Sequence, residues 1–261
     1  MRARSVVSDL RRPVRSATDG NGGARLPVAV DVSEPIKVDI WSDVACPWCY
    51  IGKRKFEAGR ASYTANAGAD APDVVVEYHS FELSPDTPVD FEGGDIEFLS
   101  THKGIPVEQV REMLARVTEI AADVGLDYHY DVLRHTNTVL AHELIHFAKS
   151  KGRQLDMKER LFAAYFTEGR HVGRVDELVD LAAEIGLDRD EARAALESHE
   201  FLDAVRADQQ QAQRYGIQGV PFFVIDDKYG VSGAQEAATF AQMLEQVAAE
   251  HSAAAVGSVE R

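Results

Sequence analysis

The stretch IKVDIWSDVACPWCYIG, residues 36–52, decides the fold of this chain. Its first six residues alternate between two faces and are rich in β-branched side chains, so they predict a strand. A short loop then leads to Cys46 and Cys49, the only two cysteines in the sequence. Two cysteines placed at random in such a chain would have this spacing roughly once in a hundred cases. The spacing suits a pair of thiols on the first turn of a helix, which can close and reopen a disulfide ring.

The composition of the chain restricts its partners. A chain of 261 residues with 45% hydrophobic residues can bury a large core in one domain or two. The formal net charge of -15 argues against nucleic acid or an anionic membrane as a general partner, because both would be repelled. The sequence holds nothing close to the roughly 18 consecutive apolar residues of a membrane span.

The N-terminal residues differ from the rest of the chain. The first 33 residues carry six arginines and lack the uninterrupted apolar segment of about 7–15 residues that a secretory signal needs. We interpret residues 1–34 as a disordered leader, or as extra residues that result from a translation start placed too far upstream. A twin-arginine signal at Arg11 and Arg12 is the alternative, but no hydrophobic stretch follows that pair. We therefore expect a cytoplasmic protein, where thiols stay reduced and a lone CxxC is catalytic or binds a metal.

The segments after the cysteines extend the predicted strand into a βαβ unit. Residues 50–63 have helical spacing, and residues 74–81 form a second β-rich run closed by Ser84 and Pro85. The thiols would then lie at the N-terminus of the helix between two strands. Strand character returns only at residues 222–225, followed by a turn and a hairpin partner at residues 229–232.

The long middle of the chain is predicted to be helical. The glycines and the apolar spacing place helices at residues 106–124, 135–151, 155–168, 175–185 and 190–215, with a last helix at residues 236–251. The fold class is therefore α/β, with a central sheet interrupted by a large all-helical insertion. We divide the chain into a leader (1–34), a first sheet part (36–94), the insertion (95–215), a second sheet part (216–251) and a flexible tail (252–261).

The position of the two thiols predicts different roles for them. Cys46 lies where the loop meets the helix, so unpaired backbone N–H groups and the helix dipole should lower its pKa. Pro47 suits the first helical turn, because its missing N–H costs nothing there. Cys49, one turn later, should be more buried and act as the resolving thiol. A structural zinc site would need two further ligands and no second CxxC exists, so we expect neither a metal nor a cofactor.

A second element, GIQGVP at residues 216–221, precedes the apolar strand at residues 222–225. A proline at the start of a strand often marks a cis peptide bond. With the upstream CxxC, the chain resembles the DsbA-type branch of the thioredoxin superfamily, and within it the FrnE-like cytosolic group. The matching segments are residues 43–52, 81–85, 137–138, 141–142, 219–224 and 232–235.

The resemblance implies a thioredoxin-like fold, with a central mixed sheet and a large helical insertion, and thiol–disulfide oxidoreductase activity. It makes Cys46 the nucleophile and Cys49 the resolving thiol. It makes Pro221 a cis-proline whose loop faces the disulfide and offers the backbone of Val220 to a substrate. Trp48 stands where the periplasmic oxidase of this branch has a histidine, which argues against a very oxidising potential.

Charged residues around the cysteines allow two interpretations each. Asp43 is either a buried proton acceptor for Cys49 or a cap that binds backbone N–H groups of the loop. Lys53 and Lys55 either support a thiolate or, more commonly for such lysines, lie on a solvated face. The sequence does not decide between these alternatives.

One motif suggests a different chemistry. Residues 142–146, HELIH, match the HExxH signature of zinc proteases. The metzincin continuation would need a glycine and a histidine where the chain has Lys149 and Gly152. We therefore interpret the motif as structural, particularly since His142 falls within a segment that matches the FrnE-like group.

The sequence thus predicts an enzyme that exchanges disulfides with a disulfide-containing protein or a low-molecular-weight thiol, in the reductase or isomerase direction. We expect a monomer or a homodimer. One alternative resembles the glutathione-dependent 2-hydroxychromene-2-carboxylate isomerases, which often have serine at the position of Cys46. Another is a peptide-binding chaperone that uses an apolar groove around Trp48 and the Pro221 loop.

Overall fold

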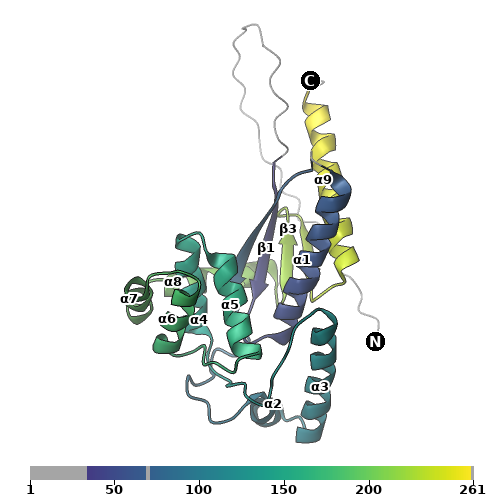
Figure 1. The fold of residues 1–261 in the computed structure, drawn as a ribbon. Coiled ribbons are helices and arrows are strands. Elements are labelled where there is room, and N and C mark those ends of the chain that lie inside the picture. Colours follow the sequence, from purple (N-terminus) through teal and green to yellow (C-terminus); the bar gives the residue numbers. More distant parts are fainter. Residues whose placement is uncertain (1–33, 69–70, 260–261) are drawn as a thin grey trace.

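The computed structural model describes residues 34–68 and 71–259, and within them a single sheet has four strands (Figure 1). These are β1 (Ile36–Ser42), β2 (Val74–Ser80), β3 (Phe222–Ile225) and β4 (Tyr229–Ser232), in the order β2-β1-β3-β4. β1 runs parallel to β2 and antiparallel to β3, and β3 pairs with β4 as a hairpin. The predicted strands and the mixed sheet are confirmed, and β3 joins the two parts of the sheet that are far apart in sequence.

Two helices cover one face of the sheet. α1 (Pro47–Ala67) and α9 (Ala237–Val259) lie side by side on this face in Figure 1. Ile36, Val38 and Ile40 of β1 point into a core that both helices share, as the alternating pattern predicts. The two helices pack closely at Gly59, where an added Cβ would lie 2.5 Å from the carbonyl oxygen of Ala237.

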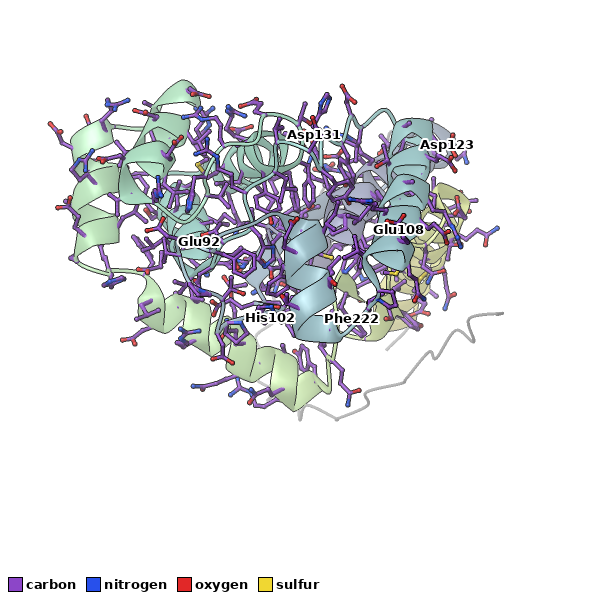
Figure 2. All side chains as sticks on the ribbon, turned by 90° about the horizontal axis from the view of Figure 1, so that it is seen from below. Glu92, His102, Glu108, Asp123, Asp131 and Phe222 are labelled. Atoms are coloured by element: carbon purple, nitrogen blue, oxygen red, sulfur yellow. The ribbon has the colours of Figure 1, made fainter. Side chains whose placement is uncertain are left out.

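The helices between β2 and β3 lie beside the opposite face and below the sheet (Figure 1). They are α2 (Asp95–Lys103), α3 (Val107–Asp123), α4 (Val139–Ser150), α5 (Gln154–Phe166), α6 (Val175–Glu184), α7 (Arg189–Glu197) and α8 (Leu202–Tyr215). α5 and α8 contact β2, while α4 packs between α5 and α8. Figure 2 looks from below, and in it Glu108 and Asp123 mark the exposed face near the two ends of α3.

Two predicted helices differ from the structure. The helix expected at residues 135–151 begins only at Val139, because the preceding side chains bind elsewhere. His135 Nδ1 lies 2.7 Å from Asp95 Oδ1, and the side-chain oxygen of Asn137 accepts the N–H of Val139 at 2.8 Å. The helix expected at residues 190–215 is broken into α7 and α8, with His199 at a positive φ of 53° between them.

The prediction of a flexible tail at residues 252–261 is wrong for residues 252–259, which continue α9. Ala253 and Ala254 are strong helix formers, and no glycine or proline interrupts the chain before Gly257. The leader predicted at residues 1–34 lies outside the described residues except for Glu34. Among the helices of the described part, none is long and apolar enough to cross a membrane.

Candidate active site

Cys46 and Cys49 lie at the open end of α1. Cys46 is the N-cap residue with extended backbone angles, and Pro47 occupies the first helical position as predicted. The N–H of Cys49 donates to the carbonyl of Cys46 at 3.0 Å, which closes the first turn. Both cysteines are free thiols with exposed fractions of 4% and 2%. The neighbouring Trp48 is 40% exposed, so substrate would approach the pair from the side of Trp48.

The loop before β3 reaches the same point. The peptide bond between Val220 and Pro221 is cis, and the Cys46 thiol donates to the carbonyl oxygen of Val220 at 3.6 Å. Pro221 is buried, and Gly52 of α1 packs directly against it. An added Cβ at Gly52 would lie 2.9 Å from Pro221 Cγ, so a glycine allows the helix to approach this loop. The structure therefore brings together the CxxC and the proline loop that the sequence singled out.

Cys49 affects the ionisation of Cys46. The side-chain hydrogen bond between the two residues, burial and the charge of Cys49 raise the pKa of the Cys46 thiol well above its usual value, and the Asp43 charge adds to this. The backbone N–H of Cys49 acts in the opposite direction. The expected lowering of the Cys46 pKa is therefore wrong for the dithiol, because it considered the helix end alone. In the dithiol, Cys46 therefore loses its proton less readily than a thiol at an open helix end would.

Asp43 supports the loop that carries Cys46. Its side-chain oxygens accept the N–H of Leu83 at 2.8 Å and, more weakly, the N–H of Ala45 at 3.4 Å. Oδ1 also lies 3.2 Å from His142 Nε2 on α4. Burial opposes the charge of Asp43, but the hydrogen bond and charge of His142 outweigh it and lower the carboxyl pKa. These contacts are those of the loop cap, and a carboxylate with a lowered pKa is a weak proton acceptor.

The helical insertion contributes directly to the surroundings of the thiols. Both cysteines belong to the apolar cluster built mainly from α4, α5, α6 and α7, separate from the core between the sheet and α9. Tyr128 donates its hydroxyl to the carbonyl of Pro47 at 2.8 Å. Lys158 of α5 is 1% exposed and donates to the carbonyl of Ser42 at 3.5 Å. Sequence reasoning missed both residues, because neither belongs to a motif.

The two lysines that follow the CxxC are neutralised by ion pairs. Lys53 is 6% exposed, which contradicts the expectation of a solvated face. Its Nζ lies 2.5 Å from Glu57 and 2.6 Å from Glu159. Lys55 pairs with Glu236 at 2.6 Å. Carboxylates therefore already balance the charges of both lysines.

A cavity of about 270 Å³ opens beside Trp48. Apolar side chains of the CPWC loop, the segment after β2, α2 and α3 form most of its wall. The lining residues are Asp43, Ala45, Pro47, Trp48, Leu83, Ser84, Asp95, Phe98, Leu99, Lys103, Met113, Leu114, Val117, His135, Thr136 and Thr138. Trp48, Leu83 and Met113 are also exposed, which provides an apolar surface for a substrate next to Cys46.

The HExxH residues on α4 have separate partners. His142 binds Asp43, and Glu143 Oε1 lies 2.9 Å from His199 Nδ1. His146 Nε2 lies 3.0 Å from Asp208 Oδ2 on α8. The three side chains therefore hold α4 against three different segments, as the structural interpretation predicts.

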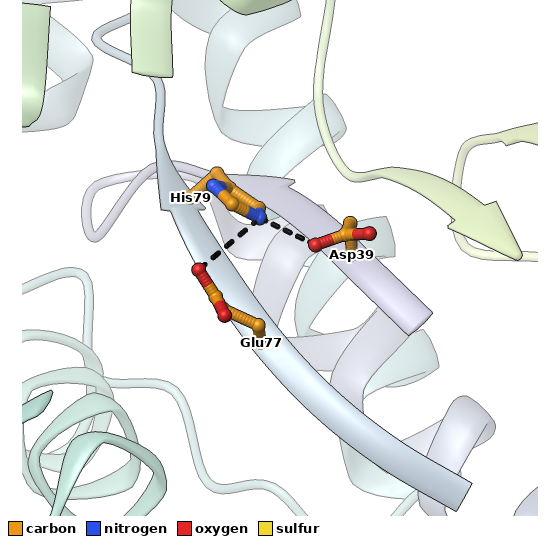
Figure 3. A group of neighbouring side chains, drawn as sticks. All are labelled: Asp39, Glu77 and His79. Atoms are coloured by element: carbon orange, nitrogen blue, oxygen red, sulfur yellow. Dashed lines mark hydrogen bonds and ion pairs between the residues drawn. The ribbon is translucent and has the colours of Figure 1, made fainter. Parts of the chain in front are cut away.

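A second polar cluster lies on the sheet face that carries Trp41. Figure 3 shows Asp39 of β1 beside Glu77 and His79 of β2, three residues whose ligand atoms could hold a metal ion. His79 Nε2 lies 2.7 Å from Asp39 and Nδ1 lies 2.9 Å from Asp208. Burial opposes protonation, but the hydrogen bonds to Asp208 and Asp39 raise the pKa of His79 to about 9. His79 thus pairs with carboxylates on β1, β2 and α8, and in this structure the cluster is an ion-pair network that ties α8 to the sheet.

This network makes stability depend on pH. Because the folded pKa of His79 is raised to about 9 from 6.5, its contribution is fully present below pH 6.5 and is lost as the pH rises through 9. We expect the free energy of unfolding, measured by urea titration with reductant present, to lose up to roughly 3 kcal/mol from this group over that window. His79→Gln should abolish that part of the slope. An identical slope in the variant would contradict this assignment.

Comparison with known proteins agrees with this geometry. The DSBA-like thioredoxin domain matches residues 37–245. The chain belongs to this family. It is 39% identical to the probable DsbA oxidoreductase SCO1869 from Streptomyces coelicolor, over 81% of this chain and 89% of that structure, with a TM-score of 0.75. It is 30% identical to the uncharacterized protein YwbO of Bacillus subtilis (strain 168) over 197 residues, which are 74% of this chain and 88% of YwbO.

A solved structure of lower sequence identity shares the fold. The cytosolic disulfide reductase DsbM from Pseudomonas aeruginosa is 18% identical, with a TM-score of 0.56 over 80% of this chain and 97% of that one. The family comparison confirms the predicted DsbA-type resemblance and is consistent with the FrnE-like group. The chain is thus a member of a thiol–disulfide oxidoreductase family, and Cys46 and Cys49 form its CxxC pair.

Proposed function

We propose that this protein reduces or isomerises disulfides through Cys46 and Cys49. The observation that carries the proposal is the meeting of three elements: Cys46 at the open end of α1, Cys49 one turn later and the Val220 carbonyl 3.6 Å from the Cys46 sulfur. An extended substrate segment that pairs with the Val220 backbone would place its disulfide against Cys46. The apolar cavity beside Trp48 would then accept neighbouring side chains of the substrate.

The reaction follows from the two positions. The thiolate of Cys46 attacks the substrate disulfide, forms a mixed disulfide and releases one substrate thiolate. Cys49 then loses its proton and attacks the sulfur of Cys46, so that the second substrate thiolate leaves and a Cys46–Cys49 disulfide forms. Two electrons pass from the dithiol to the substrate. A low-molecular-weight thiol would return them and regenerate the enzyme.

Two observations support the reducing direction. A couple is strongly oxidising when its reduced form is stabilised as a thiolate. Here burial and Cys49 raise the pKa of Cys46, which disfavours such a thiolate. A structurally similar protein is named a cytosolic disulfide reductase, and our proposal includes a cytoplasmic location.

The reduction potential tests this proposal. We expect Cys46 and Cys49 to show one two-electron transition. The protein is equilibrated in defined thiol–disulfide buffers and alkylated, and the oxidised fraction is measured by mass spectrometry. The midpoint should lie nearer to thioredoxin (about −270 mV) than to the strongest oxidase of the superfamily (about −120 mV). A value near or above about −180 mV would replace the reductase direction with an isomerase or oxidase. A pair that never oxidises would refute the proposal.

A further inference from the structure

Lys158 is a buried amine whose charge has no carboxylate partner within the described part of the chain. It projects from α5 with an exposed fraction of 1%, and its one hydrogen bond to a described residue is the 3.5 Å contact with the Ser42 carbonyl. Lys53, by contrast, is buried with two carboxylates in contact. An ammonium held out of water without a counter-charge is costly, so such a lysine favours its neutral form.

The position of Lys158 connects it to the dithiol. Ser42, which accepts its hydrogen bond, ends β1 just before the loop that carries Cys46. The Lys158 Nζ also lies 4.7 Å from the ring centroid of Phe162. That ring stacks at 4.7 Å on Tyr50, the residue after Cys49. The amine therefore lies in the layer of side chains directly behind the CxxC turn.

The charges that face this amine come from α1 and the loop before it. Cys49 and Lys53 lie on α1, and Asp43 and the N-cap residue Cys46 lie on the loop. Burial lowers the pKa of Lys158 to about 8, while the charges of Cys49, Asp43 and Cys46 act in the opposite direction and Lys53 adds to the lowering. A negative charge on the thiols therefore increases the affinity of the amine for a proton.

The remaining neighbour and the competing base complete the surroundings. Tyr78 of β2 presents its ring 5.5 Å from Nζ, and burial holds the pKa of its hydroxyl well above the usual value, so it stays neutral. Asp43 accepts N–H groups of its own loop and pairs with His142. Its lowered pKa makes it a poor base for the thiols.

We propose that the neutral amine of Lys158 accepts the proton that Cys49 loses when it attacks the mixed disulfide at Cys46. This inference rests on the proposed thiol–disulfide exchange and gives the resolving step a base. The S–H bond of Cys49 breaks, its proton becomes the third proton of the ammonium, and its electron pair forms the bond to the Cys46 sulfur. The substrate sulfur leaves with the electron pair of the broken bond. The new ammonium passes its proton to solvent or to the departing thiolate, since the neutral disulfide no longer stabilises it.

A single-turnover reaction isolates the step. Reduced protein is mixed with an equimolar aromatic disulfide such as 5,5′-dithiobis(2-nitrobenzoate), whose two coloured thiolates leave one after the other. The first release reports attack by Cys46, and the second reports attack by Cys49. In Lys158→Met we expect the second release at pH 7 to slow by about tenfold or more, with its pH profile moved upward by about one unit. The first release should change much less.

The control is Lys149→Met, which removes an exposed lysine of the insertion that pairs with Glu77. Both releases should keep the wild-type rates in this variant. If Lys158→Met leaves the second release within twofold of wild type over the whole pH range, the proposal is wrong. If neither the wild type nor Lys158→Met releases a second thiolate, and Cys46 and Cys49 never form a disulfide, the proposed exchange function itself is wrong. That outcome is distinct from failure of the Lys158 proposal.

A second measurement needs no folded variant. In protein with ¹³C-labelled lysine side chains, the Lys158 signal is identified by its contacts with the Phe162 ring. Its amine should titrate at higher pH in the reduced protein than in the oxidised protein, because only the reduced form has thiols whose ionisation stabilises the ammonium. Equal titration in the two forms would overturn the proposal.

Discussion

Cys46→Ser is expected to abolish disulfide reduction. Cys46 lies at the open end of α1 against the Val220 loop, whereas Cys49 lies inside the first turn, so Cys49 is poorly placed to form the mixed disulfide in its stead. The rate of reduction of a small-molecule disulfide, measured with a thiol reductant in excess, should fall to the uncatalysed background. We expect a loss on the order of 10³-fold or more, as found when an enzyme loses its nucleophile.

The control for this variant separates chemistry from folding. Ser62→Ala changes an exposed residue of α1 by a single oxygen atom and should retain full activity. The urea midpoint of Cys46→Ser should also be measured, since this side chain belongs to the apolar cluster of the insertion. Full activity in Cys46→Ser together with its loss in Cys49→Ser would mean that the two thiols exchange roles.

Cys49→Ser is expected to trap the substrate on the enzyme. Without the resolving thiol, the mixed disulfide at Cys46 persists until an external thiol cleaves it. Mass spectrometry after incubation with excess disulfide should show close to one adduct per protein, removed by dithiothreitol. Wild-type protein under the same conditions should end as the internal disulfide without an adduct.

This variant also decides between functions. A glutathione-dependent isomerase of the same fold would lose little on replacement of Cys49, and it would accumulate no adduct. Retained turnover in Cys49→Ser without an adduct would therefore favour the isomerase alternative over disulfide exchange.

Local patterns in the sequence were sufficient to predict the framework of the fold. The alternating residues 36–41 gave β1 its buried face, and the CxxC located the start of α1 because proline and an open helix end suit each other. The approach of the Val220 loop to Cys46 was predicted only through the family resemblance. The two segments are separated by 174 positions, and no local pattern specifies a contact at that distance.

The surroundings of the thiols could not be predicted in the same way. The helix end by itself predicted a lowered pKa for Cys46, but the burial and the second thiol that determine it depend on tertiary packing. In the sequence, Lys158 cannot be distinguished from an exposed lysine of an amphipathic helix. Its burial arises only because α5 packs against β2. Likewise, the break at His199 depends on how α7 and α8 each pack against α4, since residues 190–215 have no proline or internal glycine to mark it.

The contact between Asp43 and His142 has a consequence for how this protein can evolve. It joins the loop before the thiols to α4 across 99 positions of sequence, and both side chains are almost fully buried. Loss of Asp43 would remove this partner from the buried His142 ring, and loss of His142 would leave Asp43 chiefly with backbone N–H groups to balance its buried charge. We therefore expect exchanges at these two positions to be tolerated best when they occur together. Chimeras that take the loop before Cys46 and the insertion from different relatives should accordingly be most stable when this pair is preserved.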